Sequence, residues 1–188
     1  MILKTRAGLL LLAFMIATTV TACTAKATPA TTVSATTTTT TTPTSSPTTL
    51  PPAEQDLANA KGAIVKMWAV VDRLVNNPKS SSIQDLDAVA EGATLTMFQQ
   101  NIMKYRAANW TGSGNSIVAD TSAALAGTNS QGQSTWTVTA CIDSSTTTLV
   151  DSTGKSVQGP PYRVLHKSTV VERATNFYVA DDTAVGTC

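Results

Sequence analysis

Apolar residues recur at helical spacing over residues 53–77. The positions that share one helical face are Leu57, Ile64, Trp68, Val71 and Val75. Their separations of three, four and seven residues are those of a buried stripe on an amphipathic helix. The pair Pro51-Pro52 stands before this stripe and Asn76-Asn77-Pro78 follows it, which are typical start and stop signals. The pattern therefore predicts one long helix.

A second helical pattern follows over residues 81–105. Ser81 and Gln84 have the spacing of a capping box, in which two side chains satisfy free backbone amides at a helix start. The apolar stripe beyond them consists of Leu86, Val89, Leu95, Phe98, Ile102 and Tyr105. Gly92 interrupts this stripe, so we expect a helical region with a break near that residue.

After Trp110 the spacing changes from helical to alternating. Over 134–142 the apolar side chains of Trp136, Val138, Ala140 and Ile142 alternate with Thr and Cys, which predicts a half-buried strand. Similar stretches, separated by turn residues, are 117–125, 147–150, 162–173 and 176–180. Helices followed by consecutive strands predict an α+β fold, with the helices packed on an antiparallel sheet.

The N-terminus has the pattern of an export signal. Lys4 and Arg6 precede an apolar run over 7–20. This run is shorter than the roughly 20 residues that a transmembrane helix needs. A short positive segment followed by a short apolar segment indicates a secretory signal peptide.

The residues Val20-Thr21-Ala22-Cys23 resemble the lipobox of bacterial lipoproteins. The resemblance implies that the leader 1–22 is removed and that Cys23 is acylated, with palmitate among its two or three chains. More than one chain gives stable anchoring, so the expected partner is the lipid bilayer and the expected location is the outer face of the cytoplasmic membrane. An ordinary signal peptide with an incidental Cys is the alternative.

Residues 23–53 have the composition of a tether. From Thr24 to Ala53, 14 of 30 residues are Thr, and five Pro residues are spread among them. Such a segment has little apolar surface to bury, so we expect a disordered Thr/Pro stalk open to glycosylation. The predicted organisation is a leader over 1–22, a lipid-anchored linker over 23–53 and one folded domain over 54–188.

Two cysteines remain in the predicted domain. Cys141 closes a predicted strand and Cys188 follows the last one. An even pair of cysteines in an exported protein predicts a structural disulfide. A redox or metal site is the alternative, although the sequence contains no Cys-x-x-Cys motif.

The net charge and the few candidate catalytic side chains limit the functions that the sequence supports. The chain has 13 Lys and Arg against 12 Asp and Glu, so it lacks the basic character of nucleic-acid binding proteins. His166 shares strand parity with Tyr162 and Glu172, and these three could line a pocket, but a satisfied or surface histidine is the preferred interpretation. Asp181 and Asp182 point to opposite faces of a strand, so we interpret them as a solvated strand end. We expect no cofactor and no metal, and no catalytic residue is assigned.

The C-terminal half resembles the nuclear-transport-factor-2-like (SnoaL-like) domains of actinobacterial and actinophage lipoproteins. The similar segments are WTVTACIDSS over 136–145, DSTGKSV over 151–157 and NFYVADDTAVGTC over 176–188. The resemblance implies a cone-shaped fold and a non-catalytic domain that binds an envelope protein or a small ligand, with a role in prophage-related defence by analogy. The alternatives are an isomerase or cyclase that uses His166, and a scaffold of a secretion or conjugation apparatus.

Overall fold

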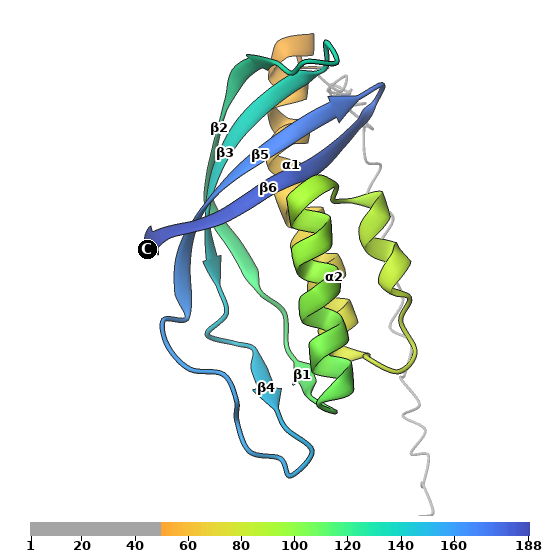
Figure 1. Ribbon diagram of the computed structural model, residues 1–188. Helices are drawn as coiled ribbons and strands as arrows, with labels where there is room; N and C mark the ends of the chain where they lie inside the picture. The colour runs from red at the N-terminus through yellow and green to blue at the C-terminus, as the bar shows by residue number, and fades with distance from the viewer. Residues whose placement is uncertain (1–49) are drawn as a thin grey trace, which may run out of the picture. The chain divides into compact units, whose positions relative to one another are not determined.

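A computed structural model describes residues 50–188 of the 188-residue chain. The elements run in the predicted order, helices first and strands after them (Figure 1). The expected leader, Cys23 and nearly all of the expected stalk lie outside the described residues. The prediction of an α+β fold with helices on a curved antiparallel sheet is confirmed.

Helix α1 spans Pro52–Asn76 and provides the long apolar face that the sequence predicts. Pro52 stands in its first turn, where the missing amide hydrogen costs nothing. The face includes Ile64 and Val71 together with Ala60, Met67 and Leu74, all buried. Helix α1 contacts all four strands of the larger sheet, and Figure 1 shows it passing behind them.

The second helical region is divided as expected. A 3-10 helix, η1, covers Ile83–Ala88, and helix α2 covers Gly92–Ala107. Gly92 has a φ of 57°, which places it in the left-handed region that favours glycine, and so it marks the break. The expected capping box is wrong: Ser82, not Ser81, precedes η1, and no side chain caps that helix. The Ser81 hydroxyl instead donates to the Asn77 carbonyl at 2.6 Å, closing the turn after α1.

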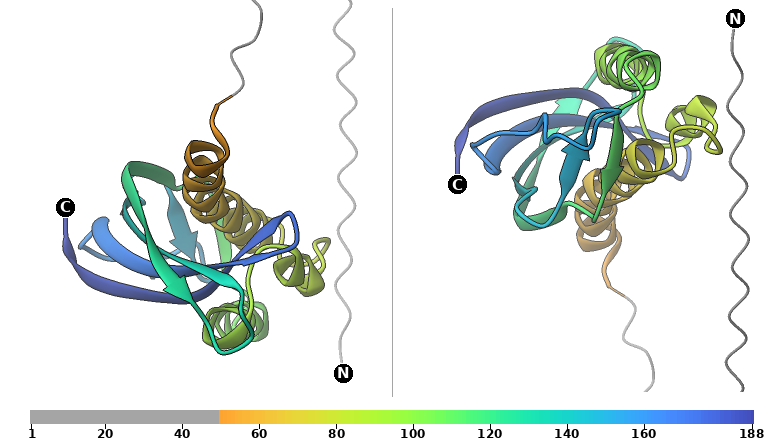
Figure 2. Two further views of the ribbon diagram at one scale, coloured as in Figure 1. Left: turned by 90° about the horizontal axis from the view of Figure 1, so that it is seen from above. Right: turned by 90° about the horizontal axis from the view of Figure 1, so that it is seen from below.

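Four strands form one antiparallel sheet in the order β2-β3-β5-β6. Their bounds are Ile117–Thr128 for β2, Ser134–Asp143 for β3, Arg163–Arg173 for β5 and Asn176–Thr187 for β6. Figure 2 shows that the strands bend strongly instead of lying flat. The alternation predicted for β3 is confirmed, because Trp136, Val138, Ala140 and Ile142 are all buried.

Strand β6 is longer than the sequence predicts. The expected strand ends at Ala180, whereas β6 continues to Thr187 and pairs with β5 as far as Val164. The pairing skips Ala180, because Val170 faces Val179 and the preceding Thr169 faces Asp181. This irregularity reverses which face later residues of β6 present, as a β-bulge does. The polar sequence after Ala180 therefore remains in the sheet, because the long β5 offers it a continuous partner.

A short two-stranded ribbon lies apart from the main sheet. Strand β1 covers Thr111–Ser113 and strand β4 covers Thr148–Val150, paired antiparallel. The ribbon lies near the lower end of α2 in Figure 1, and β1 also contacts α1. It closes the space between the two helices and the loops that enter and leave the main sheet.

The core lies between the helices and the inner face of the sheet. Ten large apolar side chains from the helices and strands contribute to it, of which six are buried and four are partly buried against them. The buried six are Ile64, Val71, Phe98, Ile102, Trp136 and Val138, and the partly buried four are Leu57, Trp68, Leu95 and Phe177. Burial of such side chains contributes about 1.5–3 kcal/mol each before chain entropy is subtracted.

Candidate functional site

A cavity of about 300 Å³ lies between α1, α2 and the β1–β4 ribbon. We call it the helix–ribbon cavity, and its lining residues that matter here are Trp68, Asp72, Phe98, Tyr105, Ser116 and Leu149. Its volume is at the lower end of the range for small-molecule sites. Aromatic rings together with polar groups that can orient a ligand are the usual make-up of such sites.

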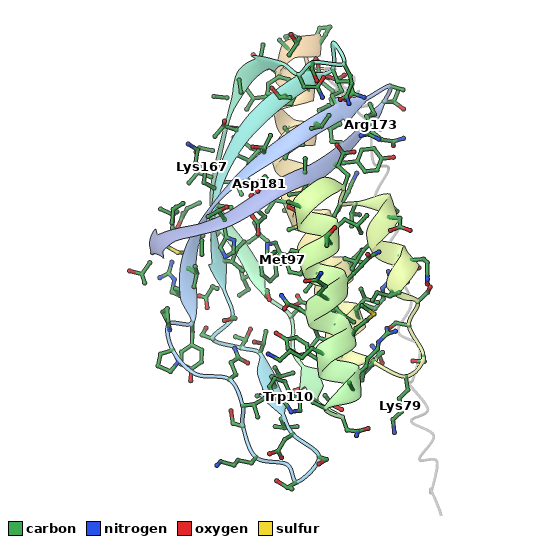
Figure 3. All side chains as sticks on the ribbon, in the orientation of Figure 1. Lys79, Met97, Trp110, Lys167, Arg173 and Asp181 are labelled. Atoms are coloured by element: carbon green, nitrogen blue, oxygen red, sulfur yellow. A yellow bond between two sulfur atoms is a disulfide. The ribbon has the colours of Figure 1, made fainter. Side chains whose placement is uncertain are left out.

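Helical periodicity explains how the two helices supply the walls. On α1, Trp68 and Asp72 are four residues apart and so lie on one face. On α2, Phe98 and Tyr105 are seven residues apart and share a second face. The two faces meet, because the Trp68 and Phe98 rings pack edge to face with centroids 5.6 Å apart. At the end of α2, Tyr105 stacks on Trp110, whose position Figure 3 shows, at 5.4 Å between centroids.

Asp72 is the charged group of the cavity. Its exposed fraction is 9%, and its carboxylate accepts hydrogen bonds from the Ser116 amide at 2.7 Å and from the Ser116 hydroxyl at 2.9 Å. Burial raises the pKa of Asp72 above its ordinary value, although the two bonds from Ser116 act in the opposite direction. Asp72 forms no ion pair with any residue of 50–188.

Two glycines let the ribbon approach the end of α1. A side chain at Gly112 would meet Val75 Cγ1 at 2.5 Å, and one at Gly114 would clash with the Thr146 carbonyl. Gly114 also has a φ of 82°, a conformation that glycine adopts without strain. The Asn76 side chain donates to the Gly114 carbonyl at 2.6 Å. Strand β1 and the residues that follow it therefore hold the rim of the cavity against α1.

His166 lies outside the cavity lining. It is on the inner face of β5, beside Ala140 of β3, and its ring packs edge to face on Trp68 with centroids 5.5 Å apart. Its Nδ1 lies 2.9 Å from a carboxylate oxygen of Asp182. The structure does not join it to its two expected neighbours. Tyr162 is exposed ahead of β5, and Glu172 lies near the β5–β6 turn opposite Phe177.

The interpretation of Asp182 as a solvated strand end is wrong. Its side chain is 1% exposed and accepts a second hydrogen bond from the Ser168 hydroxyl at 2.6 Å. The bulge at Ala180 is the reason, because it turns Asp182 inward and leaves Asp181 on the outer face. The expectation that the two carboxylates point to opposite faces is confirmed. The acidic partner of His166 is therefore Asp182 and not Glu172.

The Asp182 cluster does not have the order of a catalytic triad. A triad places His between the acid and the nucleophile, so that the ring can take the proton of the nucleophile. Here Asp182 stands in the middle and binds both Ser168 and His166. Ser168 is 2% exposed, and its hydroxyl donates to the carboxylate. The arrangement satisfies buried polar groups in the sheet.

Cys141 and Cys188 form a disulfide with Cα atoms 5.9 Å apart. The predicted pairing is confirmed. Cys141 is fully buried in β3, and Cys188 follows directly on β6. Because β5 separates these two strands in the sheet, the bridge reaches across the intervening strand.

Metal and membrane features can be assessed within 50–188. No group of three His, Cys, Asp or Glu side chains in that range is placed to hold a metal ion. No helix there has both the length and the apolar character that crossing a membrane requires.

Asp72 could have been singled out from the sequence, although the apolar stripe of the helix draws attention away from it. Asp72 follows Trp68 by one helical turn and adjoins Val71, so a carboxylate borders the stripe of an otherwise apolar face. A charged residue at such a position is expensive to bury and is a candidate for function. Ser116 carries no comparable signal, because it lies 44 residues away in a loop.

Comparison with known proteins gives a similarity of fold. No protein-family model and no curated protein matches this sequence. Among solved structures, the crystal structure of the intermembrane space region of chloroplast protein ARC6 is similar, with a TM-score of 0.50 and 10% sequence identity. The alignment covers 70% of this chain and 98% of that one. At this identity the similarity concerns the fold alone.

Proposed function

We propose that this chain is a lipid-anchored lipoprotein whose folded domain is a non-catalytic binding module. The helix–ribbon cavity is its ligand site, and a small molecule is its ligand. The observation that carries the proposal is the cavity itself: about 300 Å³, walled by Trp68, Phe98 and Tyr105, with the single carboxylate of Asp72. Convergence of a few polar groups on an apolar pocket is the usual mark of a binding site.

The anchoring part of the proposal rests on the sequence. The positive residues, the short apolar run and the small residues before Cys23 support export and acylation. The Thr/Pro-rich segment 23–53 would then hold the domain away from the bilayer. A plain coil of that length spans roughly 30 Å. In this arrangement the cavity meets ligands of the cell envelope.

We propose further that this α+β fold is a nuclear-transport-factor-2-like cone. Two observations support it: a long helix packs across a strongly curved antiparallel sheet, and a cavity lies between the helices and the β1–β4 ribbon beside that sheet. The segments over 136–145 and 176–188 that carry the sequence resemblance form β3 and β6 of that sheet.

The position of His166 favours binding over catalysis. A general base needs access to a substrate proton and a tuned pKa. The Nδ1 of His166 instead faces Asp182, and its ring packs edge to face with Trp68. Trp68 lines the cavity, whereas His166 does not. An isomerase or cyclase mechanism based on His166 has less support than a binding role.

Filling the cavity tests this proposal. Asn101→Trp adds a large ring at a half-buried lining position of α2, and Gln100→Trp is its matched control at the exposed neighbouring position. The full chain is extracted from its own membranes in mild detergent and analysed by native mass spectrometry. We expect a bound small molecule on wild type and on Gln100→Trp, and none on Asn101→Trp.

Three results would contradict the proposal. Retention of the molecule by Asn101→Trp places the site elsewhere. Recovery of the molecule in a chemically altered form makes the domain an enzyme. A wild-type chain that carries no molecule, and whose Trp68 resonance does not respond to a neutral aromatic probe such as 2-phenylethanol, has no ligand site in this cavity.

A further inference from the structure

Asp72 places an uncompensated charge in the wall of the helix–ribbon cavity. Both of its oxygens accept hydrogen bonds from Ser116, and no cationic side chain of 50–188 pairs with it. Tyr105 is the other titratable side chain among the lining residues, and it carries no positive charge. A buried carboxylate without a cation is unfavourable in a folded protein. The cavity therefore favours a partner that supplies the missing positive charge.

The Asp72 carboxylate can accept further hydrogen bonds beside those from Ser116. A carboxylate offers about four lone-pair sites, and the two hydrogen bonds from Ser116 use one on each oxygen. The Ser116 groups are uncharged, so they satisfy hydrogen bonding without neutralising the charge. Burial raises the pKa of Asp72, as expected for a carboxyl that lacks a cationic neighbour.

The aromatic walls suit a cation as well. Trp68 comes from α1, and Phe98 and Tyr105 come from α2, so rings from both helices border the cavity. The face of an aromatic ring attracts an ammonium group, and Trp does so most strongly. The same rings bury the apolar part of a ligand. One carboxylate among several rings is thus a complementary environment for an ammonium group on an aromatic or aliphatic body.

We propose that the helix–ribbon cavity binds a small organic amine in its protonated form, with the ammonium group on Asp72 and the apolar part against Trp68, Phe98 and Tyr105. This inference rests on the proposed binding function and names its ligand class. Charge-assisted hydrogen bonds to a carboxylate are stronger than neutral ones, so the charge gives selectivity over neutral ligands of equal shape.

Three probes of equal shape test the charge preference: 2-phenylethylamine, 2-phenylethanol and phenylacetate. The full chain in detergent carries 15N-labelled tryptophan, and each probe is titrated at about neutral pH with its free concentration measured. The indole signal of Trp68 reports on the cavity. Trp136, which lies in the core and does not line the cavity, serves as the internal reference. We expect the amine to bind at least about tenfold more tightly than the alcohol, and phenylacetate more weakly than both.

Asp72→Asn isolates the charge, because Asn keeps an oxygen that accepts the Ser116 amide. We expect this variant to bind the amine and the alcohol equally. Asp181→Asn removes an exposed carboxylate and is the matched control, expected to keep the wild-type preference (Figure 3). Equal binding of amine and alcohol by wild type would overturn the amine proposal and leave the binding function standing. No response of Trp68 to any probe would overturn both.

Discussion

Nδ1 of His166 and a carboxylate oxygen of Asp182 lie 2.9 Å apart across strands β5 and β6, on the inner face of the sheet. The Asp182 carboxylate accepts this hydrogen bond, and so Nδ1 carries the proton. The second oxygen accepts the Ser168 hydroxyl. Three polar side chains from two strands thus satisfy one another beneath α1, where Trp68 packs edge to face with His166.

Asp182→Ala is expected to lower the free energy of unfolding by about 1–3 kcal/mol, because it leaves the buried Ser168 hydroxyl and His166 Nδ1 without their acceptor. Urea denaturation measures the change. Asp181→Ala, at the exposed neighbouring position, should stay within about 0.5 kcal/mol of wild type. Equal effects of the two substitutions would show that the Asp182 cluster does not stabilise the sheet.

His166→Ala separates structure from function. It removes the ring that packs on Trp68 and binds Asp182, so we expect a clear loss of stability. Ligand binding at the helix–ribbon cavity should persist at temperatures where the variant is folded, because His166 does not line the cavity. Conversion of the bound ligand by wild type, lost in a folded His166→Ala chain that still binds it, would instead support catalysis.

Sequence patterns predicted the helices and the order of the long strands, but neither strand β1, nor the full length of β6, nor the inner polar groups. The 3.6-residue stripe of α1 and the alternation in β3 depend on neighbouring residues, so they can be read locally. The choice between Asp181 and Asp182 depends on the bulge at Ala180, which no turn residue marks. Continued alternation from Val179 would have placed Asp181 inside.

The helix–ribbon cavity could not be predicted from the sequence either, and the reason is similar. Its walls come from α1, α2, the β1–β4 ribbon and the loop after β3, and only the folded chain brings these together. The bonds between Asp72 and Ser116 join residues 44 positions apart. Local periodicity contains no information about such a pair. Cys141 and Cys188 were predictable over a similar distance because cysteine chemistry leaves few alternatives.

Loss of the disulfide is expected to destabilise the domain. Cys141 and Cys188 are separated by 47 positions, for which the chain-entropy model gives about 4 kcal/mol. Cys188→Ala should therefore lower the unfolding midpoint in urea strongly, and reduction of wild type should lower it to a similar value. If reductant left the wild-type midpoint unchanged, the bridge would contribute nothing to stability.

Cys23→Ala tests the anchor. If Cys23 carries acyl chains, this variant loses them, and the protein should move from the membrane fraction to the soluble fraction or the medium. Cell fractionation with immunoblotting measures the distribution. Thr24→Ala, at the next position, is the control and should stay in the membrane fraction. A Cys23→Ala protein held in the membrane as firmly as wild type would exclude lipid anchoring through this residue.

Asp72→Asn should change how stability depends on pH. The pKa of Asp72 is raised by burial, so the folded state holds its proton more firmly than the unfolded chain. Wild type therefore gains stability relative to the variant as pH falls through this raised pKa toward 3.8, the ordinary value. We expect the variant to have its largest relative advantage near neutral pH.

Urea denaturation of both proteins between about pH 7 and pH 4 measures this difference. Hydrogen bonds from Ser145 and Thr153 lower the pKa values of Asp143 and Asp151, respectively. These two carboxylates therefore stabilise the folded state less as pH falls. Both are present in each protein, and their effects cancel in the comparison. A difference that did not vary with pH would mean that Asp72 titrates alike in the folded and unfolded states.

The disulfide also makes the C-terminal part of the domain a covalent ring. Cys141 precedes the connection over 144–162 and Cys188 follows β6, so the loop and both last long strands lie inside that ring. Residues 152–161 are mostly exposed, and exposed connections are where proteases cut. A single cut there opens the ring but releases no fragment, because β5 and β6 stay bonded to β3 through sulfur. The domain can thus lose the continuity of its longest loop and remain one molecule.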